Sequence, residues 1–231
     1  PAWPPDGASE RADLIVAFRI GVHEFARAAA RRFPQARLEI DLDDLESDTR
    51  FSIARAQLRL LRWGQALRTA SVAWQYRCLE APVLALYDQA WLAAPEDVLR
   101  LRARLPAGAA VSCLPNRLQA PAAPPGPPPD GPFDLLFVGS LDYLPNEEGV
   151  LWLLRRVVPH LRRILPAGWR LTVVGRHAGP ALARRLRREP EVEFWPDAPS
   201  LGDFYARAQV ALVPLRSGGG TKLKALEAFA W

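Results

Sequence analysis

The chain has 231 residues, of which 49% are hydrophobic and 24% charged, so its length and composition allow one large or two ordinary domains with packed cores. Its apolar runs fall well short of the roughly 20 residues of a membrane-spanning helix, and its first ten residues lack the basic and apolar regions of a secretory signal. The net charge of +5 comes from dispersed arginines without interleaved aromatic residues for base stacking, so nucleic acid is not an expected partner.

Cysteine and acidic residues give no sign of a metal centre. Cys78 and Cys113 lie far apart and near no second Cys or His pair, which disfavours a zinc site or a disulfide and indicates a reducing cytoplasm. The acidic run at residues 41–48 has carboxylates for a metal, but aspartates also gather in loops and at helix starts for simpler reasons. We therefore expect no metal, and the resemblance described below implies no other cofactor.

The first part of the chain, residues 1–118, alternates between strand and helix patterns. A helix is expected at residues 22–33, and residues 48–86 form either one long helix or two, because Gly64 and Pro82 interrupt them. Short apolar strands are expected at residues 13–20, 37–42, 85–93 and 109–116.

A proline-rich stretch at residues 119–132 follows, and it is typical of a semi-rigid linker between domains. After it, residues 133–231 alternate regularly, and the expected helix at residues 146–165 contains Pro159, which is expected to kink or break it. The other expected helices are 179–188, 200–208 and 221–230, and the expected strands are 133–139, 170–175, 192–195 and 209–215. Continuous apolar strands separated by helices predict a parallel sheet covered on both faces.

The predicted fold class is therefore α/β, with two Rossmann-like domains. The chain contains no methionine and ends at Trp231 within a helical pattern, so we interpret it as a segment of a longer protein in which both domains are incomplete.

The stretch SGGGTKLKALE at residues 217–227 contains both lysines of a chain whose other basic residues are all arginine. It follows a predicted strand, and parallel sheets present their ligand-binding loops at the carboxyl ends of strands. Glycines allow close backbone approach, and the start of a helix, here with Lys222 in its first turn, suits a diphosphate. Glu227 can accept hydrogen bonds from neighbouring ribose hydroxyls, and Lys224 lies three residues before it on roughly the same helix face.

The same residues also have a simpler interpretation, which physical reasoning alone leaves equally open. The glycines can form a flexible turn, and Lys224 with Glu227 can be an ordinary surface pair. The order Gly-Thr-Lys does not match a P-loop, which disfavours an ATPase. Gly139 and Gly175 end strands at the same edge but form no GxGxxG motif, so a nicotinamide dehydrogenase has little support. Arg176, directly after a strand, can face the same cleft.

Four pieces of the second part occur in a familiar order: FVGSLDYLPNEEGV, LTVVGR, VEFWPDAPSL and VALVPLRSGGGTKLKALEAFA. Together they resemble the donor-binding domain of family 4, or group 1, glycosyltransferases, most closely the bacterial subgroup associated with exopolysaccharide gene clusters. Upstream, DLDDLES and the LPN before the linker are similar to the crossover from that family's first domain.

The resemblance implies a GT-B enzyme, in which two Rossmann-like domains face each other across a cleft. Residues 1–118 would be the C-terminal part of the acceptor domain, and residues 133–231 the donor domain without its last elements. The implied reaction moves a sugar from a nucleotide-diphosphate sugar to a saccharide or lipid-linked acceptor, with retention and without a metal. It would take place in the cytoplasm, with peripheral contact at the inner membrane face as an option.

By the same resemblance, Glu227 stands where the family binds the ribose hydroxyls, and Gly220, Thr221 and Lys222 stand where backbone N–H groups hold the diphosphate. Many members carry a glutamate where this chain has Gly219, and a basic pair in the loop that corresponds to residues 140–146, which contains none. The candidate substrate-binding residues are Gly139, Arg176, Arg216, Gly218, Gly219, Gly220, Thr221, Lys222, Lys224 and Glu227.

The catalytic base is unknown from the sequence, and His23 and Asp43 are weaker candidates for the cleft. The departures from the family pattern keep an alternative open, namely an inactive or truncated relic, or a nucleotide-binding module without transfer activity.

Overall fold

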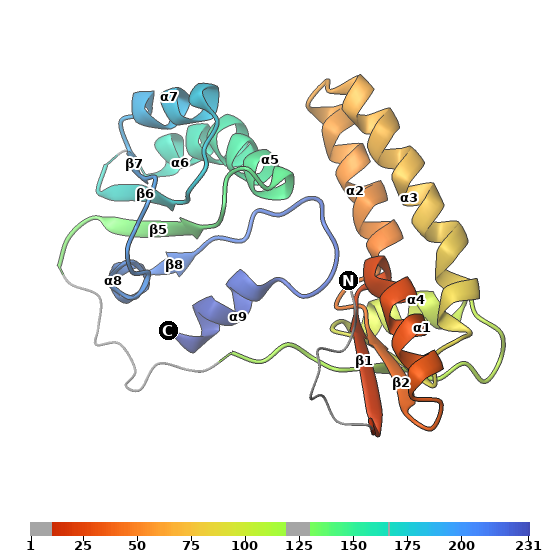
Figure 1. Cartoon of the computed structure of the whole chain (residues 1–231). Helices are drawn as coiled ribbons and strands as arrows, with labels where there is room; N and C mark the ends of the chain where they lie inside the picture. Colours follow the sequence, from red (N-terminus) through yellow and green to blue (C-terminus); the bar gives the residue numbers. More distant parts are fainter. Residues whose placement is uncertain (1–10, 119–129, 166) are drawn as a thin grey trace. The chain divides into compact units, whose positions relative to one another are not determined.

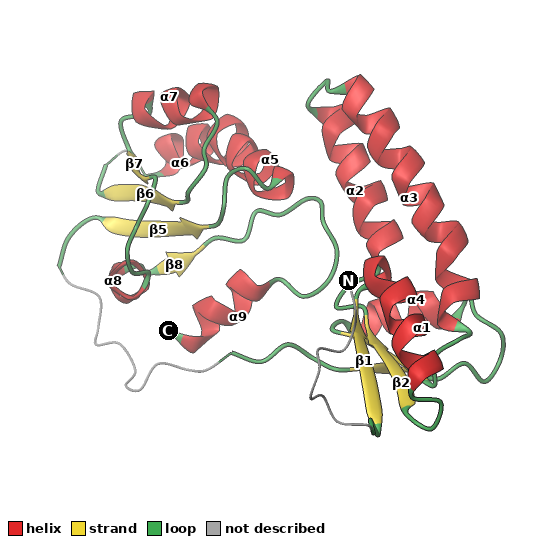
Figure 2. Cartoon of the chain, in the orientation of Figure 1, coloured by secondary structure: helices red, strands yellow, loops and turns green. Residues whose placement is uncertain are grey.

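The computed structural model describes residues 11–118, 130–165 and 167–231, and residues 119–129 of the predicted linker lie outside them. The described part consists of helices and short parallel strands (Figures 1 and 2). It divides into two compact units. The first unit contains Pro1–Phe51, Thr69–Asn116 and Gly219–Thr221, and the second contains Ser52–Arg68, Arg117–Gly218 and Lys222–Trp231. The predicted division at the linker differs from this one in two segments. Ser52–Arg68, which precede the linker, belong to the second unit, and Gly219–Thr221, which follow it, belong to the first.

The first unit contains a four-stranded parallel sheet in the order β1-β2-β3-β4. Its core is formed by strand residues such as Ile40 and Leu92 together with helix residues such as Leu84 and Leu101, all of them buried. The strands are β1 (Leu14–Phe18), β2 (Arg37–Asp41), β3 (Gln89–Leu92) and β4 (Val111–Cys113). The helical elements of this part of the chain are η1 (Ile20–Val22), α1 (His23–Arg32), α2 (Glu46–Arg59), α3 (Trp63–Leu84) and α4 (Pro95–Arg102).

The predicted helical region at residues 48–86 forms two helices. The chain leaves α2 through Leu61, whose φ of 59° is incompatible with a right-handed helix. Pro82 lies inside the last turn of α3, near its end, and does not divide it. Helix α4 was not predicted, although Pro95 at its start, acidic residues in its first turn and arginines in its last turn are typical helix signals.

The second unit contains a parallel sheet in the order β7-β6-β5-β8. Its strands are β5 (Phe133–Val138), β6 (Trp169–Val174), β7 (Val192–Trp195) and β8 (Val210–Ala211). The chain proceeds outward from β5 to β7 and then returns to the other side of β5 with β8. The strand order therefore reverses between β5 and β8, and open parallel sheets bind ligands at the carboxyl side of such a reversal.

Helices cover both faces of this second sheet, as the apolar strands predict. Leu135 and Phe137 of β5 pack on the helices α5 (Leu144–Trp152), α6 (Val158–Ile164) and α7 (Pro180–Arg188). The residue between them, Leu136, points to the opposite face and packs with α8 (Gly202–Arg207) and α9 (Leu223–Ala230). Alternate residues of one strand thus belong to two different cores, because successive side chains point to opposite faces.

Of three local predictions for this unit, the bounds of one strand and of one helix need correction. The helix predicted at 146–165 is divided into α5, a five-residue π turn, η2 (Leu153–Val157), and α6, and Pro159 lies in the first turn of α6, where a proline is tolerated. Strand β8 (Val210–Ala211) is shorter than the predicted 209–215. Helix α9 begins at Leu223 rather than at Thr221.

Within the described residues, no helix combines the length and the apolar composition needed to cross a bilayer.

Candidate functional site

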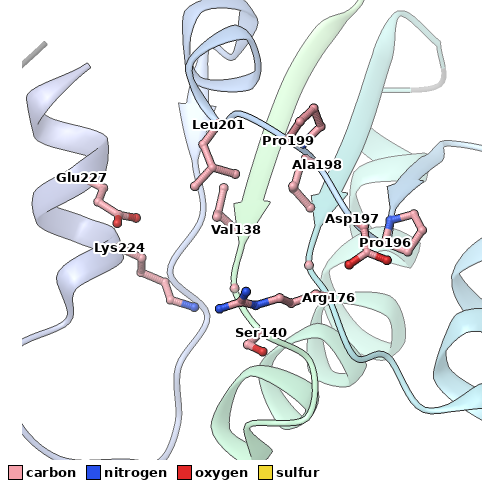
Figure 3. A pocket seen from close by; sticks show the side chains of 13 residues that line it. Val138, Ser140, Arg176, Pro196, Asp197, Ala198, Pro199, Leu201, Lys224 and Glu227 are labelled. Carbon is pink, nitrogen blue, oxygen red and sulfur yellow. The ribbon is translucent and has the colours of Figure 1, made fainter.

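A pocket of about 670 Å³ lies at the carboxyl ends of β5, β6 and β7, with α9 at its side (Figure 3). All of its lining residues belong to the second unit. The lining consists of the strand ends Val138, Gly139, Ser140, Val174, Gly175 and Arg176, the segment Pro196, Asp197, Ala198, Pro199 and Leu201, and the α9 residues Lys224 and Glu227. Its position next to the β5–β8 reversal is the expected place for a ligand in an open parallel sheet.

Two glycines allow the strand ends to approach each other closely. A Cβ atom on Gly175 would lie 2.2 Å from the carbonyl oxygen of Gly139. A Cβ atom on Gly139 would lie 2.8 Å both from Asn146 Nδ2 and from Lys224 Nζ. A side chain at Gly175 would collide with backbone, so glycine is required there, whereas a side chain at Gly139 would have to displace the ends of Asn146 and Lys224.

Lys224 supplies a half-buried cation to this pocket. Its ammonium donates a hydrogen bond of 2.6 Å to Asn146 Oδ1 and lies 4.5 Å from the centre of the Phe137 ring. Burial lowers the pKa of Lys224 to about 8, with the charge of Glu227 opposing and that of Lys222 adding to this effect. The side chain therefore still carries its charge at neutral pH, at a cost in desolvation.

Glu227 lies three residues after Lys224 and also faces the pocket (Figure 3). The hydroxyl of Tyr205 donates a hydrogen bond of 3.2 Å to Glu227 Oε2. Tyr205 itself is buried and stacks on Trp231, with ring centroids 6.0 Å apart. Burial, together with the Glu227 carboxylate, raises the pKa of Tyr205, so its hydroxyl remains a donor over the whole physiological range.

The structure brings together four of the predicted site residues, namely Gly139, Arg176, Lys224 and Glu227. Arg176 extends from the end of β6 toward the side of the pocket where Lys224 lies (Figure 3). The cations and the carboxylate come from β6 and α9, and the glycine from β5. Elements far apart in the sequence thus converge at one sheet edge.

The other predicted residues lie outside the pocket lining. Arg216 stands over the ring of Trp152, 6.0 Å from its centre. Gly218 has a φ of 93°, which favours glycine, and its N–H donates to Ser52 Oγ at 3.1 Å. Lys222 precedes the first residue of α9 instead of lying in its first turn.

Gly219, Gly220 and Thr221 belong to the first unit by their contacts. A Cβ atom on Gly219 would lie 1.7 Å from Thr49 Oγ1, and one on Gly220 would lie 2.9 Å from the Cβ atom of Asp44. The hydroxyl of Thr221 donates to the carbonyl of Ala93 at 3.3 Å. These contacts explain why glycine stands at two of the three positions, and the predicted role of this loop in diphosphate binding stays a prediction.

Several pocket residues were not predicted from the sequence. The stretch Pro196–Asp197–Ala198–Pro199 directly follows β7, so the rule that ligand-binding loops follow strand ends identifies it once the strand is placed. Asn146, which holds Lys224, carries no such local signal.

The weaker candidates have structural partners. His23 is buried, and its Nδ1 lies 3.2 Å from the hydroxyl of Tyr87. Arg19 pairs with Asp43 at 2.7 Å and with Asp44 at 2.9 Å, so both carboxylates of this part of the acidic run have an arginine partner. Among the residues that the structure describes, no group of three His, Cys, Asp or Glu side chains is placed to hold a metal ion.

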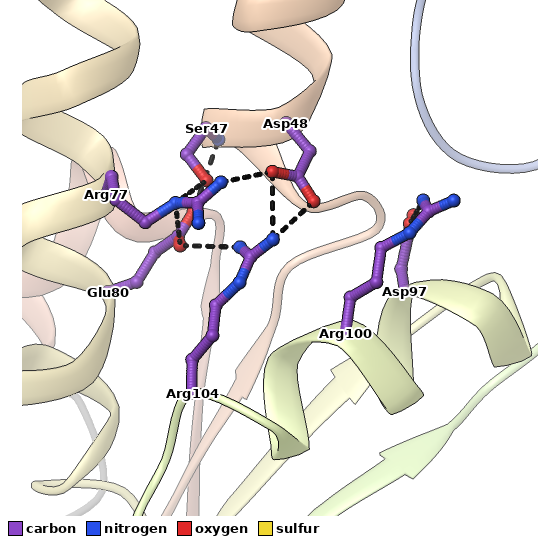
Figure 4. A network of polar contacts seen from close by, with 7 residues as sticks. All are labelled: Ser47, Asp48, Arg77, Glu80, Asp97, Arg100 and Arg104. Carbon is purple, nitrogen blue, oxygen red and sulfur yellow. Dashed lines mark hydrogen bonds and ion pairs between the residues drawn. The ribbon is translucent and has the colours of Figure 1, made fainter.

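A second buried charged cluster lies in the first unit and joins α2, α3 and the end of α4 (Figure 4). Glu80, only 2% exposed, accepts from the backbone N–H of Ser47 at 3.2 Å and lies 3.6 Å from Arg104 and 3.9 Å from Arg77. Both arginines also bind Asp48, Arg104 at 2.7 Å. Burial raises the pKa of Glu80, against the opposing effect of Ser47 and the two arginines.

Comparison with known proteins finds a family match in the second part of the chain. Residues 132–231 match the family described as glycosyl transferases group 1. No curated protein matches the sequence.

Solved structures resemble the chain over most of its length. TarM has a TM-score of 0.66 at 9% identity, and the match covers 94% of this chain and 39% of TarM. The UDP-forming α,α-trehalose-phosphate synthase from Burkholderia xenovorans, solved with glucose-6-phosphate, has a TM-score of 0.63 at 14% identity, covering 96% and 57%. The pneumococcal O-GlcNAc transferase GtfA, solved with UDP and GlcNAc, has a TM-score of 0.56 at 13% identity, covering 93% and 40%.

The chain thus spans about 40 to 60% of the length of these proteins. At such low identity the likeness concerns the fold, and it confirms the predicted α/β class with Rossmann-like parallel sheets. Residues 132–231, which contain the pocket, match a group 1 glycosyl transferase domain.

Proposed function

We propose that the protein is a glycosyltransferase and that the pocket beside α9 binds its nucleotide-diphosphate sugar donor. Glu227 accepts hydrogen bonds from the two ribose hydroxyls, and the Lys224 ammonium, with Arg176 across the pocket, faces the diphosphate. The family match of residues 132–231 and the transferases among the similar folds support this assignment.

One observation carries the proposal, namely that a cation and a carboxylate lie three residues apart on α9 and line the same pocket. A nucleoside diphosphate presents the complementary pattern, with negative phosphates next to two hydroxyl donors. The pocket is large enough for such a ligand, since small-molecule sites typically measure several hundred Å³.

In the proposed reaction the bond between the anomeric carbon and the diphosphate oxygen breaks. A new bond forms from that carbon to an acceptor hydroxyl oxygen, and the hydroxyl proton is released. Negative charge grows on the departing diphosphate, so fixed cations stabilise the transition state most strongly where water is excluded. The half-buried Lys224 ammonium meets this requirement. We propose retention at the anomeric carbon and no metal.

The acceptor side of the proposal rests on the resemblance noted in the sequence. A saccharide or lipid-linked acceptor, a role in exopolysaccharide synthesis and a cytoplasmic location with peripheral membrane contact are parts of it. Gly218–Lys222 and Arg216 are proposed to reach the diphosphate from the loop before α9, although they do not line the pocket.

Binding of nucleoside diphosphates by titration calorimetry tests the donor site. We expect UDP, GDP, ADP or another member of such a series to bind, and Glu227→Ala to weaken that binding by about 10- to 100-fold, because hydrogen bonds to a charged acceptor are lost. Glu24→Ala is the matched control, since Glu24 forms a loose surface pair with Arg27 at 3.7 Å. Equal affinities of the wild type and Glu227→Ala would contradict the assignment.

A nucleotide-binding module without transfer activity is the second candidate. It is favoured by one observation, that the loop at residues 140–146 contains no lysine or arginine, where many members of the family carry a basic pair. Incubation with nucleotide sugars and saccharide or polyprenyl-phosphate acceptors separates the two. Release of nucleoside diphosphate with a new glycosidic product supports the transferase, and binding without either product supports the module.

A further inference from the structure

Asn146 connects two walls of the pocket although its own side chain is not part of the lining. It is 5% exposed and lies in the first turn of α5. Its Oδ1 accepts the 2.6 Å hydrogen bond from Lys224 of α9, and its Nδ2 donates to the carbonyl of Ser140 at 2.7 Å. One carboxamide thus ties the loop after β5 to the helix that carries the pocket cation.

The orientation of this carboxamide is fixed by its partners. The carbonyl of Ser140 can only accept a hydrogen bond, and the ammonium of Lys224 can only donate. The amide must therefore present Nδ2 to the first and Oδ1 to the second. Gly139 leaves room for this hydrogen bond, because a Cβ atom at this position would lie 2.8 Å from both Asn146 Nδ2 and Lys224 Nζ.

The acceptor chosen for Lys224 is neutral. Glu227 attracts the ammonium and Lys222 repels it through their charges, and Arg176 and Asp197 also line the pocket. A carboxylate in place of the Asn146 amide would hold the ammonium equally well but would cancel its field toward a ligand. A neutral amide orients the cation and leaves its charge for an anion in the pocket.

We propose that Asn146 is a positioning residue of the donor site, whose carboxamide holds the Lys224 ammonium at the strand ends with its charge directed to the donor diphosphate. This inference rests on the proposed function for its ligand, whereas the contact between Asn146 and Lys224 can be tested without any ligand.

The chain contains two lysines, which makes the test direct. Lysine labelled with ¹³C and ¹⁵N gives two side-chain signals in NMR spectra, and Lys222→Arg assigns them. Asn146→Asp places a negative charge beside the ammonium, so the Lys224 titration is expected to move to higher pH than in the wild type. Asn146→Leu removes the acceptor while burial remains, so the titration is expected to move to lower pH. The Lys222 signal is expected to stay where it is.

Binding of the nucleoside diphosphate found for the wild type provides the second readout. Wild-type affinity is expected to fall as the pH rises through about 8, where Lys224 loses its proton. Asn146→Asp and Asn146→Leu are each expected to weaken binding at pH 7 by about 10-fold, the value of one charge-assisted contact. In Asn146→Leu the fall in affinity is expected to begin at lower pH.

Gln89→Leu is the matched control, because Gln89 is a buried amide of the first unit that donates to a backbone carbonyl at 2.9 Å. It is expected to lower stability without moving the Lys224 titration or the affinity.

If Asn146 is merely structural, its variants behave like this control, and an unchanged Lys224 titration in both variants overturns the positioning role. If the wild type binds no nucleoside diphosphate, the proposed function and the diphosphate role fall together, while the titration still reports on the contact. Asn146→Asp keeps the shape of the side chain, so it remains informative if Asn146→Leu does not fold.

Discussion

The protein contains two buried charged clusters that are built in opposite ways. In the first unit Glu80 and Asp48 face Arg77 and Arg104, so each charge meets its opposite (Figure 4). In the second unit the Lys224 ammonium meets a neutral amide oxygen and the face of an aromatic ring. The first cluster cancels its own field and holds three helices together, whereas the second leaves positive charge directed into a pocket.

This difference provides a physical criterion for a binding site. Burial of a charge is costly, and a structure compensates for it locally when nothing else is required. When the partner of a buried cation is neutral, the desolvation cost of the cation is not compensated locally. The binding of an anion can then offset this cost. By this criterion we expect the Glu80 cluster to be structural and the Lys224 cluster to bind an anion.

The largest effect is expected from a substitution that breaks the Glu80 cluster. Arg104→Ala removes one of two cations from Glu80, which is almost fully buried, and is expected to lower the free energy of unfolding by about 3 kcal/mol. Urea denaturation measures this loss, and Arg27→Ala on α1, a loose surface pair, is expected to change it by less than about 0.5 kcal/mol. Nucleotide affinity of the folded Arg104→Ala protein is expected to match the wild type. A loss of affinity at unchanged stability would place this cluster in the site as well.

An intermediate effect is expected when the site cluster loses its cation. Lys224→Met is expected to weaken nucleoside diphosphate binding by about 10- to 100-fold at pH 7, because the diphosphate loses its charged partner. Its cost in stability is expected to be smaller than that of Arg104→Ala, since the ammonium no longer has to be desolvated. A large loss of stability with unchanged affinity would contradict the contrast between the two clusters.

The stability of Lys224→Met is also expected to depend on pH differently from that of the wild type. The folded pKa of Lys224 is lowered to about 8, and that of an unfolded lysine is about 10.4, so between these values the unfolded chain binds more protons. Lys224 therefore makes wild-type stability rise from about pH 8 to about pH 10, and Lys224→Met is expected to lose this rise. Nucleotide affinity of the wild type falls over the same range. Denaturation and calorimetry at matched pH values measure these opposite trends, and parallel trends would contradict them.

The smallest effect concerns the hydroxyl that holds Glu227. Tyr205→Phe keeps the buried ring and its stacking on Trp231 but removes the 3.2 Å hydrogen bond to the carboxylate. It is expected to cost about 1 kcal/mol in stability and to weaken nucleotide binding a few-fold, because Glu227 loses a fixed orientation. Trp195→Phe, at an aromatic pair that leaves Glu227 untouched, serves as the comparison in the same assays. An affinity loss as large as that of Glu227→Ala would mean that Tyr205 contacts the nucleotide itself.

Local sequence patterns predicted the strands, most of the helices and the edge of the sheet where the pocket lies. Every strand of the described residues overlaps a predicted one, because short apolar segments between helices have few alternatives in a parallel sheet. Gly139, Arg176, Lys224 and Glu227 were identified because strand ends and the residues that follow them share one edge. The start of α9 was placed too early, since the positive φ values of Gly218 and Gly220 are incompatible with a helix, and β8 was predicted too long.

The tertiary structure alone decided which of these residues are partners. Asn146 lies 78 positions from Lys224 in the sequence, and no local pattern links an amide in one helix to a lysine in another. The structure also separates the predicted glycines by their surroundings. Gly139 lines the pocket, whereas Gly219 and Gly220 pack against side chains of the first unit. Side-chain composition fixes which segments become strands and helices, because periodicity acts over a few residues. Whether a buried charge is cancelled or left for a ligand depends on what the fold brings beside it.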